Sequence, residues 1–179
     1  MINNNCLFII VESDKKSKTD SIYINVIIEK FFKKYTSLVK IEYIYASGKG
    51  NLISSKIINR IKTKSREFNK CELLFVYDTD EYSTNQNDIK INNSITEYAR
   101  KNNYNVAWFC KDIENVLLNK SIDNNKKLEE AKNFIRNKDH VNININKLQA
   151  SKIKQGSSNI VNILNIIFEE LIITTIIEH

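Results

Sequence analysis

Residues 71–81 read CELLFVYDTDE, an apolar run that passes directly into acidic residues. A continuous apolar run of this length is typical of a strand that is buried on both faces of a parallel sheet. Residues 6–12, CLFIIVE, have the same pattern and also end in a carboxylate. The sequence therefore predicts two buried strands whose carboxyl ends carry acidic side chains.

The remaining segments predict further strands and helices in alternation. Two more strands are expected at 39–45 and 106–110. Apolar residues at helical spacing predict helices over 20–35, 52–68, 94–102, 112–118 and 124–137, and a last helix capped by Ser157 or Ser158. A polar loop is expected at 83–93 and a short edge strand at 141–145.

Strands that alternate with helices form a mainly parallel sheet with helices on its faces. We therefore expect an α/β fold of three layers, Rossmann-like, in which a mainly parallel four-stranded sheet is flanked by helices. The 179 residues amount to a single domain, 1–179, with a core over about 6–110 and a helical C-terminal extension over about 111–179.

The charge balance favours a polyanionic partner. Lys and Arg number 27 against 21 Asp and Glu, which gives a net charge of +6. An excess of basic residues is a common property of chains that bind nucleic acid, either DNA or RNA.

Cysteine, histidine and apolar content exclude several classes of protein. Three cysteines cannot form a closed disulfide framework, so a reducing cytoplasmic location is expected. Two histidines, His140 and His179, are too few for a zinc site built from several imidazoles. The first residues lack the features of a signal peptide, and Asn and Glu side chains interrupt the apolar segment 160–177, so no membrane association is expected.

Three carboxylates are expected to lie together at the carboxyl ends of the strands. The first strand ends in Glu12 and the third in Asp78 and Asp80. In open α/β sheets the site lies at this edge, and residues two apart in a strand point to the same face. Oxygen ligands of this kind suit Mg²⁺ (or Mn²⁺), with substrate phosphate completing the shell. A solvated acidic turn is the alternative interpretation.

The order of these elements and acids resembles the TOPRIM domain. In that family the strand-end glutamate and the Asp-x-Asp pair bind Mg²⁺ and act in phosphodiester cleavage or transfer. The resemblance implies a TOPRIM-like domain in which Glu12, Asp78 and Asp80 are catalytic and bind the metal.

Further segments are similar to the RloB-like proteins, a group allied to the nucleases of the overcoming-lysogenization-defect (OLD) type. Thr19-Asp20 with Tyr23 is similar to the Thr-Glu-x-x-Tyr element of that group, and residues 107–118, AWFCKDIENVLL, to its Ala-Trp-Ser-Asn-Pro-x-Phe-Glu-x-Trp-Leu-Leu segment. Residues 47–50 resemble its glycine loop and 157–159 the entry to its last helix. By this resemblance Asp20 and Glu114 are further metal ligands.

Several lysines lie where they could contact phosphate. Lys15, Lys16 and Lys18 follow Glu12, although a solvated basic loop would look the same. Lys49 lies between two glycines, but without GxxxxGK[ST] a plain turn is favoured over a P-loop. Lys152 and Lys154 precede the last helix and could hold an anion there, although capping alone explains the serines.

The leading hypothesis is a Mg²⁺-dependent TOPRIM nuclease that cleaves nucleic acid. The resemblance also implies a role in phage defence or a restriction-linked system, together with a separate ATPase. The sequence leaves open whether the chain forms a homodimer. One alternative is a non-catalytic subunit that binds metal, nucleic acid or a partner. Another is a receiver-like phospho-acceptor domain, which would need a lysine after a fifth strand.

Overall fold

The structure is a computed structural model that describes residues 4–177, with side-chain surroundings described for 4–138 and 141–173. Five strands form the sheet: β1 (Asn5–Val11), β2 (Lys40–Tyr45), β3 (Lys70–Asp78), β4 (Asn105–Cys110) and β5 (Ser157–Ser158). The helices are α1 (Thr19–Phe31), α2 (Ser55–Ser65), α3 (Gln86–Lys101), α4 (Ile113–Leu118), α5 (Lys127–Arg136), α6 (Ile145–Leu148) and α7 (Ile160–Ile177). Three short 3₁₀ helices are η1 (Lys33–Tyr35), η2 (Lys49–Asn51) and η3 (Asp139–Asn142). His179 lies outside the described residues.

The sheet has the strand order β2-β1-β3-β4-β5. The first four strands are parallel, as expected, and β5 pairs antiparallel with β4. In the register of the central strands Ile9 lies opposite Leu74, and Asp78 opposite Phe109. The carboxyl ends of β1 and β3 are therefore neighbours at one edge of the sheet.

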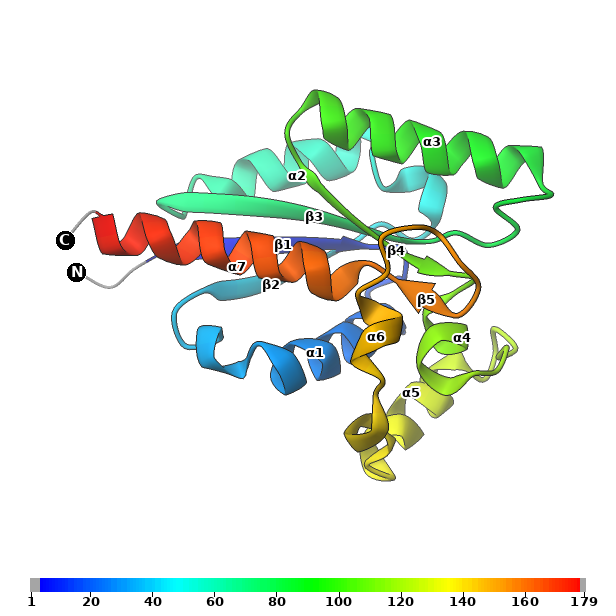
Figure 1. Cartoon of the computed structure of the whole chain (residues 1–179). Coiled ribbons are helices and arrows are strands. Elements are labelled where there is room, and N and C mark those ends of the chain that lie inside the picture. The colour runs from blue at the N-terminus through cyan, green and yellow to red at the C-terminus, as the bar shows by residue number, and fades with distance from the viewer. Residues whose placement is uncertain (1–3, 178–179) are drawn as a thin grey trace.

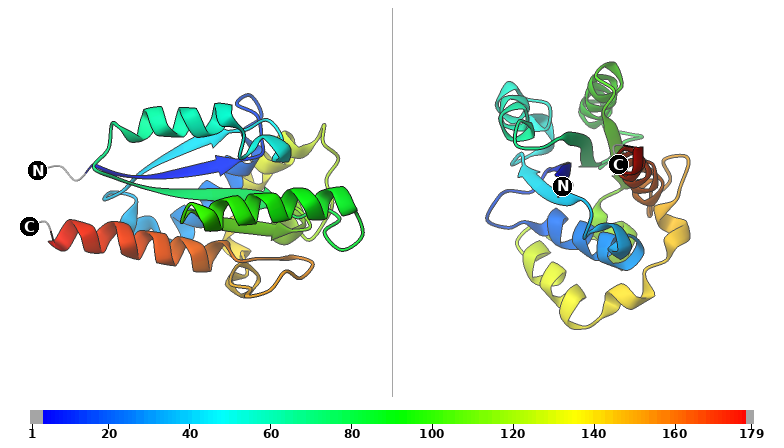
Figure 2. Two further views of the ribbon diagram at one scale, coloured as in Figure 1. Left: turned by 90° about the horizontal axis from the view of Figure 1, so that it is seen from above. Right: turned by 90° about the vertical axis from the view of Figure 1, so that its left-hand side faces the viewer.

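Helices cover both faces of the sheet, so the expected α/β fold of three layers is confirmed (Figure 2, right). On β1, Leu7, Ile9 and Val11 pack with α1, α5 and α7, while Phe8 and Ile10 pack with α2 and α3 on the other side. This alternation divides the apolar core into two layers, one on each face. Trp108 is buried in the second of them.

The predicted edge strand at 141–145 is wrong, and the sheet has five strands instead of four. The chain forms η3 and then α6 there, because the Asn144 side chain accepts the backbone N–H of Asn146 (3.0 Å) and favours the start of a helix. The fifth strand is instead Ser157–Ser158.

Two helices begin earlier than predicted. Helix α3 begins at Gln86 instead of 94, since Asn85 caps it by accepting the N–H groups of Asn87 and Asp88; the predicted polar loop therefore ends at Asn85. Helix α1 begins at Thr19 after Lys18 in a left-handed conformation (φ 54°), so Asp20 is not its cap.

Asn159 continues the sheet beyond β5 with its side chain. Its Oδ1 accepts the N–H of Trp108 (2.9 Å), and its Nδ2 donates to the carbonyl of Val106 (3.2 Å). The predicted serine cap is wrong in position, because Ser157 and Ser158 form β5 and Asn159 precedes the helix, but Ser158 Oγ does accept the N–H of Ile160 (3.1 Å). At its other end α7 lies beside the start of β1, where Asn5 Nδ2 donates to the carbonyl of Leu171 (Figures 1 and 2).

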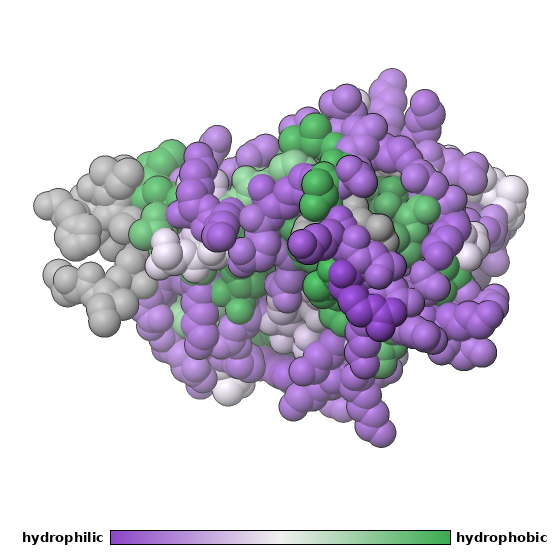
Figure 3. Space-filling view, turned by 90° about the horizontal axis from the view of Figure 1, so that it is seen from below, coloured by the Kyte–Doolittle hydropathy of each residue, from purple (hydrophilic) through white to green (hydrophobic). Residues whose placement is uncertain are grey.

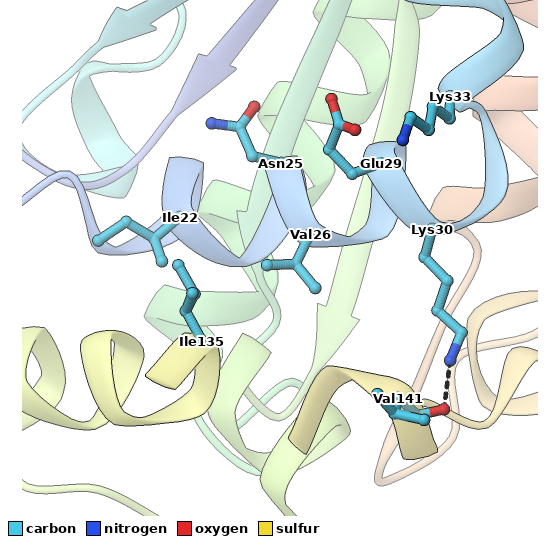
Figure 4. A pocket seen from close by; sticks show the side chains of 8 residues that line it. All are labelled: Ile22, Asn25, Val26, Glu29, Lys30, Lys33, Ile135 and Val141. Carbon is cyan, nitrogen blue, oxygen red and sulfur yellow. Dashed lines mark hydrogen bonds between the residues drawn. The ribbon is translucent and has the colours of Figure 1, made fainter. Parts of the chain in front are cut away.

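Apolar side chains are scattered among polar ones on the face that α1 and α5 form (Figure 3). One apolar groove of about 630 Å³ lies between α1 and the segment α5–η3, lined in part by Ile22, Val26 and Ile135 (Figure 4). Lys30 Nζ donates across it to the carbonyl of Val141 (2.5 Å). Among residues 4–177, no helix combines the length and the apolar character needed to cross a bilayer.

Candidate active site

Glu12 and Asp78 meet at the carboxyl ends of β1 and β3. The Asp78 N–H donates to Glu12 Oε1 (2.7 Å), so the glutamate side chain lies across the end of the neighbouring strand. The backbone carbonyl of Glu12 accepts the N–H of Gly48 (2.8 Å), which joins the loop after β2 to the same edge. This confirms that the two strand-end carboxylates lie together, as the topology predicted.

Asp20 joins them from the first turn of α1. The loop 12–18 folds back so that the Ser13 N–H donates to Asp20 Oδ2 (2.8 Å), and Thr19 Oγ1 lies 3.3 Å from Asp20 Oδ1. Glu12, Asp20 and Asp78 line one cavity of about 480 Å³, together with Lys127 and residues from the loops that follow β1 and β2.

Burial disfavours ionisation of all three carboxyl groups, and neighbouring carboxylates add to this at Glu12 and Asp78. Burial, then the charges of Asp20 and Asp80, raise the pKa of Glu12 to about 8, although the bond from the Asp78 N–H opposes this rise. The pKa of Asp78 is raised well above its ordinary value by burial and by Glu12, Asp20 and Glu114. Burial also raises the pKa of Asp20. Repulsion of this kind at Glu12 and Asp78 is typical of carboxylates that share a cation.

Helix α4 contributes a backbone donor and a fourth acid. Asp112 caps this helix by accepting the N–H of Asn115 (2.7 Å), and the N–H of Ile113 donates to Asp78 Oδ1 (3.1 Å). Glu114 has only 1% of its side chain exposed, and its Oε2 lies 3.1 Å from Nζ of Lys127. Burial raises the pKa of Glu114, and the Lys127 ammonium opposes the rise.

Lys127 is a site residue that the sequence analysis did not single out. It occupies the first position of α5, with 25% of its side chain exposed. Lys127, Ala131 and Phe134 are spaced i, i+4 and i+7, and both apolar residues are buried. A lysine on the apolar stripe of a helix was the signal that could have pointed to it.

Asp80 does not line the cavity that Asp78 lines. Strand β3 ends at Asp78, and Asp80 adopts a left-handed conformation (φ 48°) that turns its side chain toward Lys49. Lys49 is only 8% exposed, and its Nζ contacts Asp80 Oδ2 (2.5 Å), Asp88 Oδ1 (3.5 Å) and the carbonyl of Asp78 (3.0 Å). The chain does turn here, as expected, through η2, and an ion-pair network holds the Lys49 side chain.

The other lysines lie outside the carboxylate cavity. Lys15, Lys16 and Lys18 are exposed on the loop that borders it. Lys152 and Lys154 line a separate cavity of about 450 Å³ beside Gly156 and Ser157.

The donor set of the cavity suits a hard divalent cation. Glu12 Oε1 and Asp78 Oδ1 each accept one backbone N–H, and the second oxygen of each carboxylate makes no hydrogen bond to the described residues. Those oxygens, with Asp20, give an oxygen-only set of the kind that Mg²⁺ prefers. No three His, Cys, Asp or Glu side chains within the described part of the chain already stand in metal-binding geometry.

The chain matches no protein-family model, and the comparisons with curated proteins and with solved structures found no match.

Proposed function

We propose that the protein is a Mg²⁺- or Mn²⁺-dependent nuclease of the TOPRIM type. The observation that supports this best is that Glu12, Asp20 and Asp78, from three different elements, line one cavity at the carboxyl ends of parallel strands. The resemblance of 19–23 and 107–118 to RloB-like and OLD-type proteins supports the same class and a role in phage defence beside a separate ATPase.

Each residue of the cavity has a chemical role in this proposal. Glu12 and Asp78 would hold the metal with Asp20, and when bound the metal activates water and offsets charge on the phosphoryl oxygens. A carboxyl group with a pKa of about 8, such as Glu12, can also exchange a proton near neutral pH. Lys15, Lys16 and Lys18 lie on the bordering loop, where they would attract the nucleic-acid backbone.

Asp80 has a structural part in the proposal. It neutralises Lys49, and Lys49 holds the end of β3 through the carbonyl of Asp78. This departs from the TOPRIM pattern, in which both aspartates of Asp-x-Asp bind metal.

The test is cleavage of supercoiled plasmid, single-stranded DNA and RNA with Mg²⁺ or Mn²⁺. We expect metal-dependent cleavage that EDTA abolishes and that Asp78→Asn and Glu12→Gln each reduce by about 100-fold or more. Asp123→Asn, an exposed carboxylate on a loop outside the cavity, is the matched control and should leave the rate unchanged. Equal cleavage by the wild type and both site variants would contradict the proposal.

Two other functions give different results in the same preparations. The strand order with Asp78 at the end of the third strand is also that of receiver domains, although β5 is antiparallel here and Asn159 follows it instead of lysine. A receiver would become labelled by a small phosphodonor at Asp78. The presence of Lys127 among the carboxylates also favours a non-catalytic binding subunit. Such a subunit would bind nucleic acid without cleaving it and would keep that binding in Asp78→Asn.

A further inference from the structure

Lys127, which lines the carboxylate cavity, forms an ion pair with the buried Glu114. The Glu114 and Lys127 side chains are 1% and 25% exposed, and 3.1 Å separates Glu114 Oε2 from Lys127 Nζ. No other ion pair to Glu114 is formed within the described residues. The carboxylate is therefore neutralised by the chain itself.

The packing of α5 against α1 fixes the position of the lysine. Phe134, two turns along α5, packs against Tyr23 of α1 with 5.3 Å between ring centroids. Ala131, one turn along, is fully buried in the same core. Because Lys127 shares this stripe with Ala131 and Phe134, its side chain starts from a rigid backbone and points to the inside.

The ammonium also acts on the two nearer carboxylates of the cavity. Its charge favours ionisation of both Asp78 and Asp20, and Asp78 and Glu114 in turn hold the lysine protonated despite its burial. The cavity thus already contains a positive charge, which contacts Glu114 and acts on two of the acids that would hold a divalent cation.

We propose that the Lys127 ammonium takes the place of a second divalent cation, so that the site binds a single metal ion through Glu12, Asp20 and Asp78 while Glu114 binds only Lys127. The inference rests on the proposed function and sets the number of metal ions in it. A second cation at Glu114 would have to displace the lysine, which would leave a buried ammonium without its partner, and would also be repelled by it.

The test is the number of Mn²⁺ ions bound per chain, measured by calorimetry and by the electron paramagnetic resonance of free Mn²⁺. We expect one ion in the wild type. We expect Asp78→Asn to weaken its binding by at least tenfold. The double variant Glu114→Gln/Lys127→Met, which removes both charges of the pair and keeps both shapes, should still bind one ion with at least wild-type affinity.

The remaining outcomes separate this inference from the proposed function. Two ions in the wild type, with one lost in Glu114→Gln, would overturn the inference and leave the nuclease proposal standing. A single ion whose binding the double variant weakens tenfold would also overturn it, because Glu114 would then be a ligand. No bound ion in the wild type would overturn the metal-dependent function itself. Circular dichroism of each variant checks that the fold is retained.

Discussion

Asp78 and Asp80 lie two residues apart, but their side chains have different partners. Asp78 shares a cavity with Glu12 and Asp20, whereas Asp80 pairs with Lys49. The separation follows from the backbone, because side chains alternate regularly only within a strand and β3 has ended before Asp80. Lys49 thereby ties the carboxyl end of β3 to η2 and to Asp88 at the start of α3.

Replacing Lys49 by methionine tests that network. We expect Lys49→Met to lower the free energy of unfolding by about 1–3 kcal/mol, because the carbonyl of Asp78 and the Asp88 carboxylate both lose a charged donor. Asp80→Asn should cost less, since Asp80 is 45% exposed and Lys49 keeps its other contacts. Urea unfolding of the three proteins at one pH gives the comparison. A larger loss in Asp80→Asn than in Lys49→Met would contradict this role of the lysine.

Glu12 makes stability depend on pH. Its pKa is about 8 in the folded protein, so the folded state holds a proton that the unfolded chain releases near its ordinary value of about 4.3. The stabilisation is complete below that ordinary value and is lost as the pH rises through about 8. We therefore expect the free energy of unfolding in EDTA to fall between pH 5 and pH 8.

Glu12→Gln should make that fall shallower, as urea unfolding at pH 5, 6, 7 and 8 would measure. Asp14→Asn is the control, because hydrogen bonds from the N–H groups of Ser17 and Lys16 lower the pKa of Asp14 and keep its titration outside this range. An unchanged slope in Glu12→Gln would show that Glu12 does not contribute.

Among the elements, the six-residue helix α4 affects the site through its first residues. Asp112 caps the helix, Ile113 donates its N–H to Asp78, and Glu114 pairs with Lys127. A short helix gains little from its own hydrogen bonds, so its cap matters for holding these groups in place.

Loss of that cap has a measurable cost. We expect Asp112→Ala to lower the free energy of unfolding by about 1 kcal/mol, because the N–H of Asn115 loses its acceptor. Asp112→Asn keeps an acceptor oxygen and should stay within about 0.5 kcal/mol of the wild type. Thermal and urea unfolding would decide, and equal losses in both variants would mean that the charge matters instead of the cap.

The sequence predicted the elements whose pattern is local. The apolar runs that end at Glu12 and Asp78 located two buried strands and their acids, because strand ends in a parallel sheet converge. Lys127 could not be found in this way, since its contact with Glu114 depends on how α5 packs on α1. The antiparallel β5 was also missed: two serines carry no strand pattern, and only their pairing with β4 makes them a strand.

For the whole molecule, the net charge of +6 predicts salt-dependent binding to nucleic acid. With two or three phosphate contacts, we expect affinity to fall by about 10- to 40-fold between 50 and 200 mM salt. Fluorescence anisotropy with the Asp78→Asn variant would measure this without cleavage. The dependence of affinity on salt should become weaker in the triple variant Lys15→Gln/Lys16→Gln/Lys18→Gln. The matched comparison is the double variant Lys152→Gln/Lys154→Gln. Binding that does not vary with salt would contradict the expectation.

The amide of Asn159 has a consequence for how the sheet can grow. By bonding both Trp108 N–H and the carbonyl of Val106, it occupies backbone groups that a strand from a neighbouring chain would need, and β5 occupies the groups beyond them. On the opposite edge β2 is paired on one side only, with β1. Lateral addition of a foreign strand, the first step of aggregation by sheet extension, is thus directed to β2, where Lys40 and Glu42 would place charges in the new seam.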